Sequence, residues 1–264
     1  HYNLLTAEIH PDRRSLGRAA GEAVAAKIRE LLGRQDRVRM VFAAAPSQNE
    51  FLETLCAAEG LDWKRVTAFH MDEYLGLSAD APQSFRRYLK EHLFDHVQLG
   101  EVHLIAGEAS SPEAECDRYA RLLAEAPLDL VCLGMGENGH LAFNDPPVAD
   151  FTDPKMVKVV QLDEACRRQQ VHDGCFARLE EVPTHAITLT IPVLFSGGWL
   201  YCVVPGPTKR EAVKNALTGP ISTTCPASIL RIHPRARLYL DRDSTAWMDI
   251  EGTCKGFGAR SLWR

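Results

Sequence analysis

The sequence predicts an α/β protein with a doubly wound, mostly parallel, Rossmann-like sheet and helices on both faces. Two observations lead to this fold class. Short apolar runs alternate along the chain with segments whose apolar residues recur at helical spacing, and such alternation is typical of parallel strands joined by crossover helices. In addition, 45% of the 264 residues are apolar, enough for a well-buried core. No linker, repeat or low-complexity stretch divides the chain, so we expect one domain over residues 1–264.

The first half of the chain begins this alternation. Small and apolar residues recur at helical spacing from Leu16 to Leu32, with charged residues between them, which indicates an amphipathic helix. The apolar run from Val38 to Ala44 follows as a buried strand. The next expected elements are a helix near Ser47 to Ala58, a strand at Arg65 to His70, a helix from Pro82 to Phe94 and a strand around Val102 to Ile105.

The second half continues the pattern after one interruption. The polar segment from Asp163 to Leu179 is helix-prone and rich in Arg and Gln. We expect it to belong to a helical lid of about residues 155–182. The other elements expected here are a helix at Pro112 to Leu123, a strand at Leu128 to Leu133, strands at Ala186 to Ile191 and Trp199 to Val204, a helix at Thr208 to Leu217 and a strand at Arg237 to Leu240.

Composition excludes several classes of partner. The net charge is −5 and the Lys and Arg residues form no basic block, so we expect no nucleic acid to bind. No apolar run approaches the roughly 18 to 20 residues that span a bilayer, and the N-terminus lacks the pattern of a signal peptide. The cysteines stand singly, without a CxxC pair, and predict free thiols in the cytoplasm. They are Cys56, Cys116, Cys132, Cys166, Cys175, Cys202, Cys225 and Cys254.

Two segments that follow predicted strands carry groups suited to acid and base catalysis. Ligands of open α/β sheets bind beyond the carboxyl ends of the strands. At one such end Asp72 and Glu73 lie side by side, although adjacent carboxylates alone are more often an acidic loop. At another, His140 lies in a glycine-rich loop that includes Gly136 and Gly139. Histidine can exchange protons near neutral pH, but a single loop histidine is usually structural, so both interpretations stay open.

A third segment is suited to binding an anion. The strand that ends at Val204 leads through a Gly/Pro turn into a helix start that carries Lys209. Free backbone N–H groups and the helix dipole both favour negative charge at such a start. A solvated lysine is an equally common alternative.

Together these segments resemble the glucosamine-6-phosphate deaminases, within the wider group that includes 6-phosphogluconolactonases. The resemblance covers nearly the whole chain, and its motifs occur in the family's order. The most specific stretches are Phe69 to Leu77 (FHMDEYLGL), Ser84 to Val97 ending in LFDHV, Gly134 to Pro146 (GMGENGHLAFNDP) and Pro226 to His233 (PASILRIH).

The resemblance implies conversion of glucosamine 6-phosphate and water into fructose 6-phosphate and ammonia. Asp72 would move the proton from C2 to C1, and His140 would open the sugar ring. The chemistry needs no metal or organic cofactor, because the carbonyl formed on ring opening acidifies the C2 proton. The lid would keep water from the reactive intermediate. Asn138, Asp145 and Glu137 complete the expected catalytic set, and the expected substrate and phosphate ligands are Ala45, Ser47, Gln48, Glu73, Gly136, Gly139, Lys209, Arg168 and Gln170. We also favour a homo-oligomer.

Three departures from the family pattern indicate a divergent subgroup. Asn138 and Asp145 replace the usual Asp and Glu around the histidine, and the Asp145 side chain is one methylene shorter, while Glu137 supplies some negative charge. Pro46 removes an N–H donor from the first phosphate loop. Gln170 stands where the family places a phosphate-binding Arg, with Arg167 and Arg168 nearby. The exact substrate therefore stays open.

Three alternative functions remain. A 6-phosphogluconolactonase shares the fold but usually has Asp-Gly-His in place of Asn138-Gly139-His140. A sugar-phosphate isomerase that releases no ammonia would use Asp72 and His140 in the same roles. A non-catalytic sensor would need Lys209 but neither the acid nor the base. His92 and His96 have a spacing that can hold a metal, but no third ligand is evident.

Overall fold

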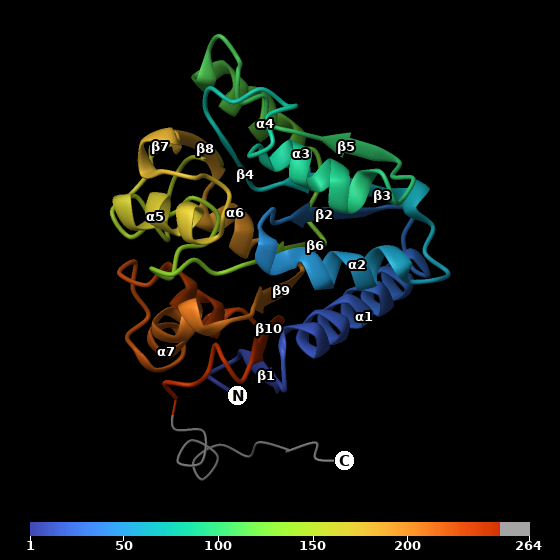
Figure 1. Cartoon of the computed structure of the whole chain (residues 1–264). Coiled ribbons are helices and arrows are strands. Elements are labelled where there is room, and N and C mark those ends of the chain that lie inside the picture. The colour runs from blue at the N-terminus through green and yellow to red at the C-terminus, as the bar shows by residue number, and fades with distance from the viewer. Residues whose placement is uncertain (249–264) are drawn as a thin grey trace.

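The computed structural model of the chain describes residues 1–248, which form two β-sheets. The strands are β1 (Thr6–His10), β2 (Val38–Phe42), β3 (Val66–His70), β4 (Asp72–Tyr74), β5 (Glu101–His103), β6 (Leu130–Leu133), β7 (Val157–Gln161), β8 (His185–Leu189), β9 (Trp199–Val204) and β10 (Ala236–Asp241). The larger sheet has seven parallel strands in the order β1-β10-β9-β6-β2-β3-β5 (Figure 1). This confirms the predicted fold class.

Helices cover both faces of the larger sheet. They are α1 (Arg13–Leu32), α2 (Asn49–Ala57), α3 (Phe85–Leu89), α4 (Pro112–Ala124), α5 (Glu164–His172), α6 (Ile191–Phe195) and α7 (Arg210–Thr218). Met40 and Phe42 of β2 pack in one apolar cluster with α1, α2 and α3, whereas Val41 packs in a second with α4, α6 and α7. Alternate side chains of a strand point to opposite faces. A strand covered on both faces is therefore apolar at consecutive positions, which explains the runs in the sequence.

The smaller sheet has the order β4-β8-β7 and is antiparallel. The expected strand at Ala186 to Ile191 exists as β8, but it lies in this second sheet and not in the parallel one. Neither β4 nor β7 was expected. β4 has three residues, too few for a periodic signal, and β7 lies in the segment interpreted as a helical lid. In Figure 1 this sheet and α5 lie together on the left.

Two helical regions differ from expectation. The helix predicted from Pro82 begins at Phe85, because Ser84 caps it by accepting a hydrogen bond from the N–H of Arg87, and its last turn, Lys90–Phe94, is a π-helix. Residues 155–182 hold β7, α5 and a 3₁₀ turn at Leu179–Glu181. Only part of the expected lid is therefore helical.

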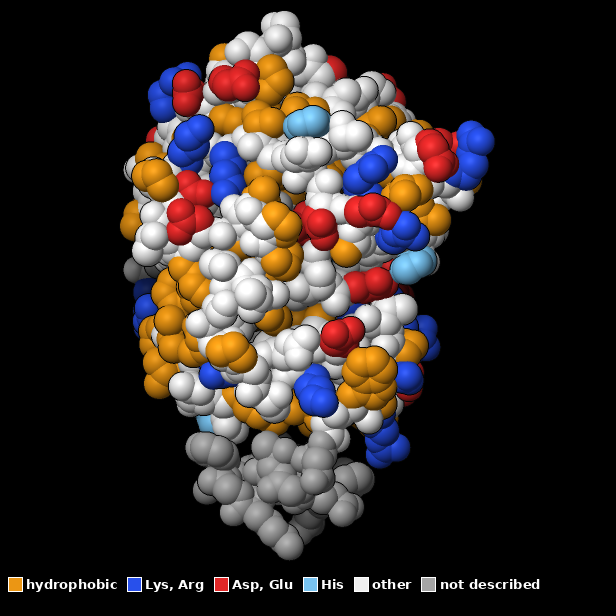
Figure 2. Space-filling view, turned by 90° about the vertical axis from the view of Figure 1, so that its left-hand side faces the viewer, with side chains coloured by type: hydrophobic (Ala, Val, Ile, Leu, Met, Phe, Trp, Pro, Cys, Tyr) orange, Lys and Arg blue, Asp and Glu red, His pale blue; other side chains and the backbone are white. Residues whose placement is uncertain are grey.

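Within residues 1–248, no helix is long and apolar enough to cross a bilayer. The seven cysteines of this part of the chain are free thiols, and Cys254 lies outside it. On the face that carries α5 and α7, acidic and basic side chains of the described residues are intermixed (Figure 2).

Candidate active site

A pocket at the carboxyl ends of the parallel strands brings three predicted groups together. Asp72, His140 and Lys209 all line it, although they come from β4, the loop after β6 and the turn after β9. Four further predicted residues share the lining: Ala45, Ser47, Gly136 and Gln170. The pocket therefore combines a carboxylate, an imidazole and an ammonium group.

Asn138 fixes the orientation and tautomer of His140. The Nδ2 group of Asn138 donates to a carboxylate oxygen of Asp145 at 3.2 Å, so the amide oxygen faces the histidine. That oxygen accepts the backbone N–H of His140 at 3.0 Å and lies 2.6 Å from Nδ1. Because an amide oxygen can only accept, this hydrogen-bond network assigns the proton to Nδ1. The Nε2 atom of neutral His140 is then a proton acceptor.

Asp145 reaches the histidine despite its shorter side chain. One carboxylate oxygen lies 3.1 Å from Nδ1 of His140, and the other accepts the backbone N–H of Asp163 at 3.2 Å. Burial alone would raise the pKa of Asp145, but the hydrogen bond and charge of His140 outweigh it and lower that pKa below 3.8. An ionised Asp145 stabilises a protonated His140. The pair can therefore support proton uptake on the ring.

Two glycines shape the loop around His140. A Cβ atom on Gly136 would lie 2.0 Å from Cε1 of the imidazole, so the ring occupies the space of a side chain. Gly139 has φ +81°, and a Cβ there would meet Sγ of Cys225 at 2.6 Å. Only glycine fits both positions without displacement of the ring or the loop. Gly136 lines the pocket, whereas Gly139 acts through the turn that it permits.

The smaller sheet positions Asp72. As the first residue of β4 it pairs with Thr188 of β8, and the preceding carbonyl, of Met71, accepts the N–H of Leu189 at 2.8 Å. Burial raises the pKa of Asp72 well above 3.8, and the negative charges of Glu73 and Asp145 raise it further. A carboxylate with a raised pKa is a stronger base. This environment suits proton abstraction.

Glu73 has a structural position and does not line the pocket. Its carboxylate accepts the backbone N–H groups of Tyr74, Phe85 and Arg86 at 2.9 to 3.1 Å. It also accepts Nε of Arg86 at 3.0 Å, and both side chains are buried. The predicted substrate ligand thus joins β4 to the start of α3.

Lys209 supplies the positive charge of the pocket. A turn at Gly206, with φ +95° and its N–H bonded to Asp241 at 3.0 Å, leads into the 3₁₀ turn Pro207–Lys209 before α7. Burial lowers the pKa of Lys209, while the charges of Asp173 and Glu137 oppose this effect. Across the pocket, Ala45 and Ser47 face the same space, but Gln48 is buried outside the lining, where its Nε2 lies 3.3 Å from the carbonyl of Val203.

Helix α5 presents two neutral side chains to the pocket, Gln169 and Gln170. The guanidinium groups beside them point elsewhere. Arg168 is exposed and pairs with Glu164, while Arg167 donates to the carbonyls of Leu179 and Val182. The predicted role of Arg168 as a pocket ligand therefore has no support in this arrangement.

Glu137 is connected to α5 and not to His140. Its backbone N–H donates to the side-chain oxygen of Gln169 at 2.7 Å, and its carboxylate lies 3.3 Å from Nδ1 of His172. The carboxylate that contacts the imidazole of His140 is therefore that of Asp145, whereas the carboxylate of Glu137 faces His172.

The pocket has an apolar wall that was not predicted from the sequence. Phe85 of α3 and Phe143 line the pocket with stacked rings whose centroids lie 5.5 Å apart. Phe143 is held because its N–H donates to Oγ1 of Thr188, and the neighbouring Asn144 donates to the carbonyls of Leu141 and Leu189. Phe143 lies inside the GMGENGHLAFNDP motif, which was a usable signal, but nothing in the sequence connects Phe85 with that loop.

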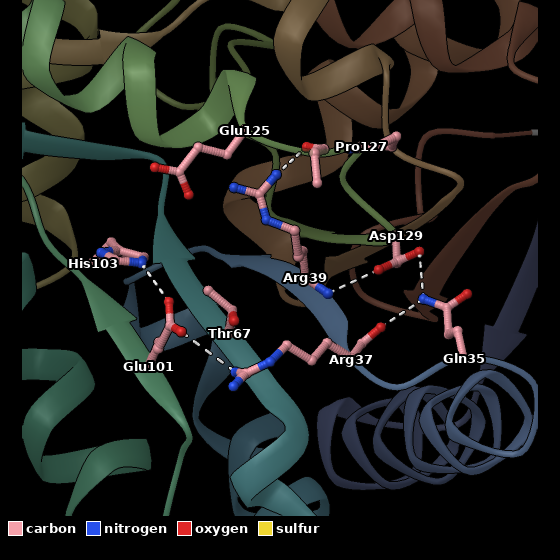
Figure 3. A pocket seen from close by; sticks show the side chains of 10 residues that line it. Gln35, Arg37, Arg39, Thr67, Glu101, His103, Glu125, Pro127 and Asp129 are labelled. Carbon is pink, nitrogen blue, oxygen red and sulfur yellow. Dashed lines mark hydrogen bonds and ion pairs between the residues drawn. The ribbon is translucent and has the colours of Figure 1, made fainter.

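A larger cavity, of about 510 Å³, lies at the opposite ends of the strands (Figure 3). Several of its polar groups pair with one another. Asp129 accepts the N–H of Arg39 at 2.8 Å and Nε2 of Gln35 at 3.0 Å, and Glu101 pairs with Arg37 and His103. Since ligands of parallel α/β sheets bind at the carboxyl ends, we assign the candidate site to the pocket of His140.

Residues 11–240 match the sequence profile of the family described as glucosamine-6-phosphate isomerases/6-phosphogluconolactonase. A glucosamine-6-phosphate deaminase from Exiguobacterium sibiricum is 34% identical over 260 residues, 98% of this chain and 91% of that protein. A glucosamine-6-phosphate deaminase from Listeria monocytogenes is 35% identical over 227 residues, 86% of this chain and 95% of that protein.

Solved structures are similar over most of the chain. A monomeric glucosamine-6-phosphate deaminase superposes with a TM-score of 0.84 at 28% identity and covers 92% of this chain and 100% of its own. A 6-phosphogluconolactonase from Thermotoga maritima gives a TM-score of 0.73 at 21% identity, with 90% and 99% coverage. The second likeness concerns the fold alone.

Proposed function

Because the chain belongs to the family of glucosamine-6-phosphate isomerases and 6-phosphogluconolactonases, we propose that it is a glucosamine-6-phosphate deaminase. In this function it is an enzyme of carbohydrate metabolism that converts glucosamine 6-phosphate and water into fructose 6-phosphate and ammonia. The observation that carries the proposal is the hydrogen-bonded His140, with Nε2 as acceptor, in the same pocket as the buried carboxylate Asp72. Acid–base isomerisation of a sugar needs these two groups.

His140 opens the sugar ring. Its Nε2 accepts the proton of the C1 hydroxyl, and the resulting imidazolium is stabilised by Asp145 at 3.1 Å and by the amide oxygen of Asn138. The proton then passes to the ring oxygen, which leaves C1 as an aldehyde. The neutral Asn138 substitutes for a charged residue here, because it fixes the tautomer while Asp145 supplies the charge.

Asp72 then transfers a proton along the open-chain sugar. Its carboxylate removes the proton from C2, which the adjacent carbonyl has acidified, and returns it to C1, while the oxygen on C1 takes up a proton and the amino group on C2 gives one up. C2 becomes an imine, and water hydrolyses it to the ketone of fructose 6-phosphate with release of ammonia. A positioned base of this kind contributes about 10² to 10⁴ in rate.

Lys209 binds the phosphate together with Ser47 and the backbone at Ala45. No arginine among residues 1–248 shares the pocket lining, so the phosphate contacts one full positive charge and the neutral amide of Gln170. Anchoring the phosphate brings C1 and C2 near Asp72, which is the positional part of catalysis.

Helix α5 is the covering element of a lid in this proposal. The pocket beneath Gln169 and Gln170 holds only about 60 Å³, less than the roughly 300 to 1,000 Å³ that small-molecule sites usually offer. Substrate entry therefore requires displacement of α5. The cytoplasmic location and the homo-oligomer stay predictions.

The test is a paired assay of purified protein with glucosamine 6-phosphate, in which ammonium and fructose 6-phosphate are measured together. Equal formation of both products, reduced at least about 100-fold in Asp72→Asn, supports the proposal. Asp80→Asn, an exposed aspartate on a loop, is the matched control and should leave the rate unchanged. Isomerisation without ammonium, or turnover of a phosphogluconolactone alone, would contradict it.

A further inference from the structure

A cysteine from the lid lies against the histidine–carboxylate pair. The metal-binding atoms of His140, Asp145 and Cys166 all lie within 4.8 Å of one another, and all three residues are buried. Cys166 belongs to α5, whereas the other two belong to the loop after β6. The three groups come from two separate parts of the chain and converge on one point.

The spacing of these atoms fits a tetrahedral metal ion. Zinc binds sulfur at about 2.3 Å and nitrogen or oxygen at about 2.0 to 2.2 Å, which places neighbouring ligand atoms roughly 3.3 to 3.8 Å apart. The Nδ1 atom of His140 and the oxygen of Asp145 are already 3.1 Å apart. The sulfur of Cys166 lies within 4.8 Å of both atoms, so shifts of about 1 Å bring it to the separation of zinc ligands.

The donor set and the local charge favour a thiophilic divalent cation. One thiolate, one imidazole and one carboxylate are typical zinc ligands, whereas Mg²⁺ and Ca²⁺ prefer oxygen alone. Asp72 adds negative charge beside the cluster. We propose that His140, Asp145 and Cys166 form an inhibitory binding site for Zn²⁺ and similar thiophilic divalent cations.

Binding at this site stops catalysis through the histidine tautomer, a step that rests on the proposed function. The metal takes the lone pair of Nδ1, so the imidazole proton moves from Nδ1 to Nε2, and the thiol of Cys166 releases its proton to solvent. With a proton on Nε2, His140 can no longer accept one from the C1 hydroxyl. The metal also replaces the contact between His140 and Asn138.

The pocket provides the route for the ion. His140 lines the pocket, and the glutamines that follow Cys166 on α5 cover the same space. Displacement of α5 for substrate entry therefore exposes the cluster too. Return of α5 to its place over the pocket then brings Cys166 back beside His140 and Asp145.

The first test measures binding directly and needs no turnover. Zn²⁺ is titrated into the metal-free protein by calorimetry, and Co²⁺ is used as a spectroscopic probe for sulfur-to-cobalt charge transfer. We expect one equivalent to bind with a thiolate signal in the cobalt spectrum. Cys166→Ala should lose that signal and weaken Zn²⁺ binding at least about tenfold, since even loss of an outer partner costs 10- to 100-fold.

Cys175→Ser is the matched control, because this lid thiol is not part of the cluster. It should bind Zn²⁺ and be inhibited like the parent, whereas Cys166→Ala should require at least about tenfold more Zn²⁺ for half inhibition of its own activity. A cobalt spectrum without thiolate character in the parent protein overturns the inference. So does equal Zn²⁺ sensitivity of parent and Cys166→Ala. A deaminase that binds no metal refutes only this inference, while a protein that binds Zn²⁺ but turns over no substrate refutes only the proposed function.

Discussion

Replacement of Arg86 by methionine should destabilise the protein strongly, because it leaves the buried carboxylate of Glu73 without its cation. Arg86 contacts Glu73 through both its backbone N–H and Nε, at 3.0 Å each. Methionine keeps the backbone donor and fills much of the same space. The variant therefore removes the charge and leaves most of the packing.

The size of the effect follows from the burial of the pair. Removal of one partner from a buried ion pair typically costs about 3 to 5 kcal/mol. For a protein of this size that corresponds to a fall in Tm of roughly 6 to 20 °C. At low pH, protonation of Glu73 reduces the loss of stability in Arg86→Met, because the buried carboxyl group is then neutral. Burial already raises the pKa of Glu73 above 4.5, and loss of the Arg86 charge raises it further. The folded variant then binds a proton that the unfolded chain releases, so its stability falls as pH rises.

Urea unfolding at several pH values measures both features. We expect Arg86→Met to lose about 3 to 5 kcal/mol at neutral pH and less as the pH is lowered toward 4.5. The double variant Glu73→Gln/Arg86→Met should recover part of the loss, because no buried charge remains. A loss below about 1 kcal/mol, or one that is the same at every pH, would refute this account of Glu73.

Three further predictions concern the pocket. Lys209→Met should lower kcat/KM for glucosamine 6-phosphate about 10- to 100-fold, since a charged hydrogen bond is worth about 1.5 to 3 kcal/mol; steady-state kinetics measure this, and the variant Arg210→Met, at a half-buried neighbour outside the pocket lining, is the control with unchanged kcat/KM. The pH profile of kcat/KM should rise with pH through the raised pKa of Asp72, so an acid limb centred at or below 3.8 would contradict the role of base. Gly139→Ala should lower the free energy of unfolding by about 1 to 3 kcal/mol through backbone strain, and by a further amount through the clash with Cys225. Gly174→Ala has a similar positive φ but no atom within 4 Å, and an equal thermal shift in both variants would rule out the clash.

Most of the central sheet was predictable because its buried strands are short apolar runs, but the edge strand β1, which is only partly buried, was not predicted. The predicted strand at Trp199 to Val204 coincides with β9, and that at Val38 to Ala44 ends two residues beyond β2. The second sheet was not predictable in the same way. β4 has only three residues, and two of them are the carboxylates Asp72 and Glu73. Its pairing with β8 joins positions far apart in sequence, and no local pattern encodes such a contact.

The residue types indicated which chemical role each side chain could have, but not which way each side chain points. Asp72 and His140 lie in one pocket, as expected from their places after predicted strands. Glu73, next to Asp72, points to Arg86, because successive side chains of a strand face opposite ways. Arg168 and Gln170 are two apart on α5, so they lie on different faces of the helix, and only the glutamine faces the pocket. Direction of this kind depends on the register of an element, which a single sequence leaves undetermined.

The smaller sheet has a consequence for how this fold can diversify. Between β6 and β9, neighbours in the larger sheet, the chain makes one excursion that carries His140, Asp145, α5 and the strand paired with Asp72. It leaves and re-enters the parallel sheet at adjacent strands. Replacement of this excursion alone would exchange the ring-opening group, the cover and the support of the base as a unit, while the strand order of the parallel sheet stayed intact. New reactions can then arise by the grafting of one continuous segment, without redesign of the core.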